Sequence, residues 1–67
     1  MIGLQFVIEN EIEYQSATEA ELVIKTCPFC NDDRYKLYLN KATGLYNCKL
    51  CGHSGNIYML SKIWCFR

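Results

Sequence analysis

The chain has 67 residues, a formal net charge of zero and a hydrophobic fraction of 51%, which together exclude a multidomain protein and an intrinsically disordered chain. Ordering so many residues costs on the order of 100 kcal/mol, and apolar burial in so small a body roughly cancels that cost. We therefore expect a disulfide, a metal or a partner to supply the remaining stability. No apolar run approaches the roughly 20 residues of a membrane span, so we expect no membrane contact.

Residues 1–20 predict an N-terminal extended segment. Residues 4–9 combine partial alternation with β-branched side chains, which favours a strand. Residues 10–11 either turn this strand or let it continue through residues 12–14, and residues 16–20 indicate a loop. Residues 21–26 then predict a strand that leads directly into Cys27.

A β-hairpin is predicted over residues 34–48. Residues 34–40 alternate between two faces, residues 41–44 form the turn, and residues 45–48 form the return strand. Gly44 supplies the positive φ that such a turn usually needs. The alternation places Tyr35, Leu37 and Leu39 on one face, opposite Lys36, Tyr38 and Asn40.

Residues 56–66 predict a C-terminal helix. The apolar side chains of Ile57, Leu60, Ile63 and Trp64 recur at helical spacing. Either Ser54 or Asn56 is placed to cap the helix N-terminus. Cys65 lies in this segment, where packing in a core or interface is the favoured role and a reactive or ligating thiol is the alternative.

Two Cys-x-x-Cys pairs carry the strongest chemical signal. Cys27 and Cys30 form the first pair, Cys48 and Cys51 form the second, and 17 residues separate them. This spacing fits the template of a tetrahedral zinc site, whose closed shell of four thiolates makes the ion structural rather than catalytic. The predicted fold is therefore a small zinc-stapled β-rich domain over residues 1–67: a zinc ribbon of antiparallel strands with one C-terminal helix. Its ribbon core spans residues 21–55.

Two other uses of the cysteines are disfavoured. Residues 1–5 contain no basic stretch and no long apolar core, so we expect no secretory signal peptide and a cytoplasmic location. In that thiol-preserving compartment, cysteine pairs indicate metal ligands before disulfides, and an odd total of five cysteines fits complete pairing poorly. A thioredoxin-type redox site needs only one such pair.

No catalytic constellation is recognisable. No Ser or Cys nucleophile pairs with His53 in a local motif, and Glu11 and Glu13 are better explained as a solvated strand face. We therefore expect no enzyme activity from this chain alone. His53 lies two residues beyond Cys51, too close for a substitute ligand, so we expect a surface residue beside the metal that contacts a phosphate.

The charge distribution and the hairpin favour nucleic-acid binding. Residues 1–21 carry five Glu and no Lys or Arg, whereas all seven basic residues follow. Basic side chains attract backbone phosphates, and aromatic faces stack on single-stranded bases. The alternative is that the charges only keep the domain soluble. The candidate contacts to single-stranded DNA are Arg34, Lys36, Tyr38, Lys41, Lys49 and His53, with the Glu-rich residues 9–21 facing away or meeting a protein partner.

The chain contains the motifs Cys27-Pro28-Phe29-Cys30 and Tyr46-Asn47-Cys48-Lys49-Leu50-Cys51-Gly52, followed by Gly55 and an apolar segment expected to be helical. In these motifs it resembles the N-terminal zinc-binding domain of bacterial and phage DNA primases. The resemblance covers roughly residues 21–62. Bacterial members usually have His at the position of Cys30, so the all-cysteine set resembles the phage primase-helicase version more. Residues 1–20 match nothing in that family.

The resemblance implies a template-recognition module that reads a short single-stranded DNA template and helps to hold the initiating nucleotides. Polymerisation then requires a catalytic primase domain or helicase, in cis or in trans. The alternative function is a zinc ribbon that docks proteins in a transcription or viral complex. Salt-dependent binding of single-stranded DNA distinguishes the two.

Overall fold

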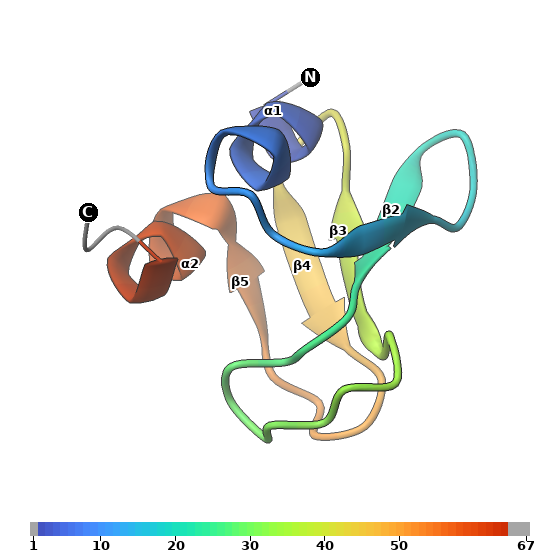
Figure 1. The fold of residues 1–67 in the computed structure, drawn as a ribbon, viewed down its shortest axis with the longest axis vertical. Coiled ribbons are helices and arrows are strands. Elements are labelled where there is room, and N and C mark those ends of the chain that lie inside the picture. Colours follow the sequence, from blue (N-terminus) through green and yellow to red (C-terminus); the bar gives the residue numbers. More distant parts are fainter. Residues whose placement is uncertain (1, 65–67) are drawn as a thin grey trace.

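A single antiparallel sheet organises the molecule, which the computed structural model describes over residues 2–64. The five strands follow one another in the order β1-β2-β3-β4-β5 (Figure 1). The buried side chains of both helices join the core on one face of the sheet. The elements are α1 (Ile2–Glu9), β1 (Tyr14–Ser16), β2 (Glu21–Ile24), β3 (Leu37–Asn40), β4 (Leu45–Cys48), β5 (Ser54–Asn56) and α2 (Ile57–Trp64).

The predicted fold class is confirmed: the domain is small and β-rich, with antiparallel strands, a helix after the last strand and the four cysteines grouped together. Among the described residues, no helix is both long and apolar enough to cross a membrane. The expected helix also included residues 65–66, which lie outside the described residues.

The strand predicted over residues 4–9 is wrong, because this segment belongs to helix α1. The apolar residues of this segment fit the period of a strand as well as that of a helix, and tertiary contacts decide that the helix forms. Gly3, Phe6 and Val7 form the buried face at helical spacing. The N–H groups of Gly3 and Leu4 donate to the carbonyl of Lys41 at 2.9 and 3.3 Å, which satisfies two of the donors that a helix start leaves open.

Helix α1 ends in a Schellman-type turn. The Glu11 N–H donates to the Ile8 carbonyl at 3.2 Å, and the Ile12 N–H donates to the Val7 carbonyl at 2.9 Å. Glu11 takes the left-handed position of this turn, with φ of 54°. The turn expected at residues 10–11 is therefore present, but it ends a helix and leads into β1.

The register sorts the strand residues onto two faces. Leu22 pairs with Leu39 and Leu39 with Tyr46, and these three side chains lie in the core under the helices. Side chains alternate along a strand, so the next row of cross-strand partners lies on the other face, which we call the helix-free face. This row consists of Gln15, Val23, Tyr38, Asn47 and Ser54. The core comprises Phe6, Val7, Leu22, Ile24, Cys27, Leu37, Leu39, Tyr46, Cys48 and Leu60.

The β3–β4 hairpin forms as predicted, with Gly44 in its turn at φ of 78°. The expected packing of Tyr35 beside Leu37 and Leu39 is wrong. Tyr35 has a φ of 60°, which breaks the alternation before β3 begins, and its hydroxyl lies 3.4 Å from the Glu13 carboxylate. The hairpin strand is therefore shorter at its start than the sequence indicates.

Helix α2 starts at the cap that the sequence predicts. The Asn56 side-chain oxygen accepts from the N–H groups of Tyr58 at 3.0 Å and Met59 at 3.3 Å. Leu60 is fully buried, Ile57 and Trp64 are partly buried against the core, and Ile63 stays 38% exposed. Of the four apolar residues that the sequence places on the buried side of this helix, three are therefore buried or partly buried.

Gly3→Ala tests the close approach of α1 to the hairpin. A Cβ at this position would overlap the backbone carbonyl oxygen of Asn40. Because that neighbour is backbone rather than a flexible side chain, we expect a loss of about 1–3 kcal/mol in the free energy of unfolding. Chemical denaturation of the zinc-loaded protein measures it. Gln5→Ala on the exposed side of the same helix is the control, and an equal effect of the two substitutions would contradict the packing.

Candidate metal centre

Four cysteine sulfurs meet where the loop after β2 faces the loop after β4. The Sγ atoms of Cys27, Cys30, Cys48 and Cys51 all lie within 4.8 Å of one another. The Cys27–Cys51 and Cys30–Cys48 pairs are each 3.9 Å apart, and all four thiols are free. A tetrahedral ion with bonds of about 2.3 Å to sulfur sets its ligands about 3.8 Å apart. The predicted ligand set is therefore assembled at the spacing of a metal site.

Two loops of matching backbone structure, which we call the knuckles (residues 27–32 and 48–53), hold the sulfurs. In each, the residue after the second cysteine donates its N–H to the carbonyl of the first: Asn31 to Cys27 at 2.8 Å and Gly52 to Cys48 at 2.9 Å. In each, the N–H of the first cysteine donates to the carbonyl of the residue five positions later: Cys27 to Asp32 and Cys48 to His53, both at 2.9 Å. The two cysteine pairs are thus held by one local structure used twice.

The residue that follows each second cysteine has a left-handed backbone. Gly52 has a φ of 76° and Asn31 a φ of 60°. Glycine adopts this region freely, and asparagine tolerates it better than most residues. Asn31 was not singled out from the sequence, although its place after Cys30 matches that of Gly52 after Cys51.

The apo thiols differ in acidity because their surroundings differ. Burial raises the pKa of Cys27 to about 12. Burial acts in the same direction at Cys48, but backbone N–H groups of Cys51 and Leu50 outweigh it and bring the pKa down to about 7. The Cys51 N–H lies 3.4 Å from the Cys48 sulfur. Since a metal binds the thiolate, it displaces the remaining thiol protons as it enters.

The donor set decides which chemistry the site supports. Four soft thiolates in a tetrahedral arrangement suit Zn²⁺, and no position of the shell remains for water or substrate. The residues therefore fit one structural metal ion, as predicted, with zinc as the ion expected from the donors.

A group of three nearly parallel aromatic rings joins the two knuckles. The Phe29 ring in the first knuckle stacks on the His53 imidazole in the second, with centroids 3.7 Å apart. Tyr46 lies 5.6 Å from Phe29 and 6.0 Å from His53. His53 is exposed and outside the ligand cluster, as the sequence analysis expected. The structure adds its partner, Phe29, to which sequence reasoning assigned no role.

Tyr46 connects this aromatic group to the sheet. Its side chain is 3% exposed, and its hydroxyl has no hydrogen-bond partner among the described residues. Burial, followed by the nearby thiolates of Cys27 and Cys51, raises the pKa of Tyr46. Gly55 makes room for the phenol, since a Cβ there would lie 2.9 Å from the hydroxyl oxygen.

The structure gives direct contacts among three of the six predicted nucleic-acid contacts. Lys36, Tyr38 and Lys49 come together on the helix-free face: the Lys49 N–H donates to the Lys36 carbonyl at 2.9 Å, and the Lys49 ammonium lies 5.3 Å from the centre of the Tyr38 ring. Arg34 instead pairs with Asp32 at 2.9 Å. Lys41 lies in the hairpin turn, where its ammonium donates to the Ser16 hydroxyl at 3.0 Å.

Residues 9–21 were expected to face away from the DNA-contacting hairpin or to meet a protein partner, and Glu13 among them contacts both Lys25 and Tyr35. The Glu13 carboxylate lies 3.8 Å from the Lys25 ammonium and 3.4 Å from the Tyr35 hydroxyl. Cys65, for which packing was expected, lies outside the described residues.

No family model, curated protein or solved structure matches the chain. The primase resemblance consequently rests on the motifs around the four cysteines.

The metal content provides the first test of this site. We expect one zinc per chain in native protein, and Cys48→Ser should abolish stoichiometric binding because it removes a buried thiolate ligand. Cys65→Ser is the matched control and should leave the zinc content unchanged. Elemental analysis with a thiol assay measures both. Disulfides in place of zinc, or an equal loss in both variants, would contradict the assignment.

His53→Ala tests the ring contact between the knuckles. Loss of a stacked pair costs about 0.5–1.5 kcal/mol, roughly a two- to tenfold weakening of zinc affinity. His53→Phe keeps a ring against Phe29 and should bind zinc like the natural chain. Competition with a chromophoric chelator measures the affinity. If the two variants weaken zinc binding equally, the imidazole acts in some way other than through stacking.

Proposed function

We propose that this chain is a zinc-stapled module that contacts single-stranded DNA through the helix-free face of its sheet, as a template-recognition domain of a DNA primase does. The observation that carries the proposal is the cluster of Tyr38, Lys36 and Lys49 on that face, directly beside the second knuckle. An aromatic ring with the Lys49 ammonium over it, and with Lys36 next to Lys49, matches the two needs of single-strand binding, which are a surface for base stacking and cations for phosphates.

The placement of the two lysines supports an anionic ligand. Alternation from buried Leu37 puts Lys36 on the face of Tyr38, and the backbone hydrogen bond to Lys49 makes the two lysines cross-strand neighbours. Like charges on neighbouring strand positions are destabilising. A phosphate bound between them would remove that repulsion.

Base stacking on Tyr38 requires the Lys49 ammonium to move aside. An exposed cation–π contact contributes about 0.5–1 kcal/mol, whereas a base stacked on an aromatic side chain contributes about 1–3 kcal/mol. The exchange is therefore favourable, and the released ammonium becomes available to a phosphate. The flexible four-carbon stem of lysine allows this movement.

Asn47 extends the cluster with a group able to read a base edge. It pairs directly with Tyr38 in the register, its side chain is exposed, and the structure gives its amide no bond to another described residue. A carboxamide offers both a donor and an acceptor, which matches the edge of a base stacked on Tyr38. Sequence reasoning missed Asn47 because only the strand register shows that it lies beside Tyr38.

The chemistry of primer synthesis belongs to a partner in this proposal. A closed thiolate shell offers no position for a nucleotide, so polymerisation falls to a catalytic primase domain or helicase, in cis or in trans. The reducing cytoplasm, which keeps four thiols available to zinc, is the proposed location.

A docking module in a transcription or viral complex is the second candidate, and the outer side of α2 favours it. Tyr58 is 69% exposed and Met59 is 47% exposed. Neighbouring exposed apolar side chains of this kind are typical of protein interaction surfaces.

Titration of fluorescent single-stranded oligonucleotides at two salt concentrations tests the primary proposal. Tyr38→Ala should weaken binding by about 1–3 kcal/mol, which is roughly five- to 150-fold. Lys36→Ala should reduce the salt slope by about 0.7 through one lost phosphate contact.

Lys41→Ala is the matched control for Lys36→Ala, because Lys41 lies in the turn, where its ammonium bonds Ser16. It should bind like the natural chain. If Lys36→Ala and Lys41→Ala weaken binding equally, the basic charge acts without a defined site. If the natural chain does not bind at low salt, the docking module becomes the better account.

A further inference from the structure

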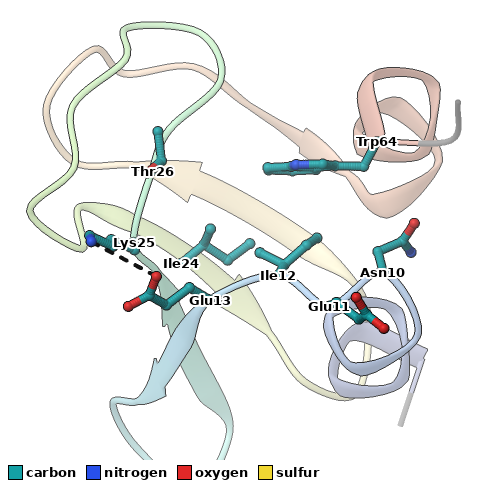
Figure 2. A pocket seen from close by; sticks show the side chains of 8 residues that line it. All are labelled: Asn10, Glu11, Ile12, Glu13, Ile24, Lys25, Thr26 and Trp64. Atoms are coloured by element: carbon teal, nitrogen blue, oxygen red, sulfur yellow. Dashed lines mark ion pairs between the residues drawn. The ribbon is translucent and has the colours of Figure 1, made fainter. Parts of the chain in front are cut away.

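The sheet offers a ligand two different sides. On the helix-bearing side, Ile12, Ile24 and Trp64 are among the residues that line a groove of about 270 Å³ (Figure 2). On the helix-free side, the proposed DNA-binding cluster at Tyr38 lies close to Leu45, whose side chain is 58% exposed. The helix-free side therefore places an exposed apolar side chain next to the proposed DNA contacts.

Leu45 is the first residue of strand β4. The side chains of Tyr46 and Cys48 in this strand are buried, and Leu45 and Asn47 alternate with them. Leu45 therefore lies on the helix-free face together with Asn47. The solvated face of an antiparallel sheet usually carries polar side chains, and Leu45 departs from that pattern.

Leu45 continues an apolar strip that crosses three strands. Val23 pairs with Tyr38, Tyr38 pairs with Asn47, and Leu45 lies two residues before Asn47 on β4. Leu45 and Tyr38 are therefore diagonal neighbours, with about 7–8 Å between them. Since Val23 is only 8% exposed, Tyr38 and Leu45 provide the accessible part of the strip. Contiguous apolar surface of this kind is typical of binding sites.

The two accessible side chains of the strip have different electrostatic surroundings. The register partner of Leu45 is Asn56, a neutral residue whose side-chain oxygen caps α2. Lys36 and Lys49 lie at the other end of β3 and β4, where the second knuckle begins. A nucleotide carries its charge on the phosphate rather than on the base. The lysine end therefore suits a phosphate, and the neutral end at Leu45 suits a base.

The distance between Tyr38 and Leu45 favours an unstacked strand. Stacked bases are about 3.4 Å apart, roughly half of the 7–8 Å between these two side chains. Two neighbouring bases reach both side chains only after they separate from each other. Proteins that bind single strands prefer pyrimidine runs through weak stacking and backbone flexibility, so pyrimidines meet this need best. Thymine also carries a methyl group that contacts apolar side chains.

We propose that Leu45 is a second base-binding position beside Tyr38, and that the two positions together select an unstacked, thymine-containing step of single-stranded DNA. The inference rests on the proposed function, because the phosphates bound by Lys36 and Lys49 and the base stacked on Tyr38 anchor the strand. The next base then lies over Leu45, with its methyl group packed against the leucine side chain. This contact distinguishes thymine from uracil, which lacks the methyl group.

Short oligonucleotides of equal length, made of deoxythymidine, deoxyuridine or deoxyadenosine, test the selection. The zinc-loaded full-length protein is titrated with each at low salt, and fluorescence anisotropy measures the affinity. We expect deoxythymidine to bind about fourfold more tightly than deoxyuridine, which is the effect of burying one methyl group. Deoxyadenosine should bind more weakly than deoxythymidine, because its bases must first unstack. Tighter binding of deoxyadenosine would overturn the selection of an unstacked step.

Leu45→Ser locates the methyl contact and should bind the deoxythymidine and deoxyuridine oligonucleotides equally. Leu45→Val retains an apolar side chain and should keep a preference for thymine. Leu50→Ser is the matched control, because Leu50 is 52% exposed but lies in the second knuckle, outside the strip. It should keep the full difference between the two oligonucleotides.

Equal binding of deoxythymidine and deoxyuridine by the natural chain, or a difference that survives in Leu45→Ser, would overturn the second position. If Tyr38→Ala still weakens binding in that case, the proposed function stands without it. If the natural chain binds none of the three oligonucleotides, the proposed function and this inference fail together.

Discussion

Four sulfur atoms must converge from two loops whose cysteine pairs are separated by 17 residues, and the rest of the structure depends on that convergence. Among the described residues the core cluster has ten members, which is small, and the knuckles contribute Cys27 and Cys48 to it. Zinc binding to such thiolates is worth on the order of 10 kcal/mol, similar to the whole stability of an ordinary domain. A metal bound by the four cysteines would therefore supply what the apolar core of so short a chain lacks.

The metal also couples the two faces of the sheet. Cys48 ends β4 on the core face, while Asn47, one residue earlier, points to the helix-free face. Lys49, one residue later, reaches Tyr38. Fixing the second knuckle through its sulfurs thus also fixes the backbone that carries the proposed base-reading and phosphate-binding groups. A loss of zinc should then disorganise the binding face without any direct contact between metal and ligand.

How much of this was predictable depends on the range of the determining contacts. The ligand set, the hairpin turn at Gly44 and the Asn56 cap follow from residues close in sequence, so the sequence predicts them well. Helix α1 was missed because its apolar spacing also fits a strand, and the deciding contacts lie at Asn40 and Lys41, far along the chain. The sequence also does not show which lysines are neighbours, because this depends on the pairing register of the strands. In the structure Lys36 lies next to Lys49, whereas Lys41 lies in the hairpin turn. The groove lined by Ile12, Ile24 and Trp64 joins three distant segments and leaves no local signal.

Zinc removal followed by amide NMR tests most directly the claim that the metal organises this fold. We expect a chelator to collapse the dispersed amide signals of the knuckles and of the β3–β4 hairpin, and one equivalent of Zn²⁺ to restore them. The side-chain signals of Phe29 and His53 should lose and regain their ring-current shifts together with those amides, because their stacking joins the two knuckles. A spectrum that stays dispersed after complete metal removal would contradict the account, since the protein core alone would then be sufficient to hold the sheet.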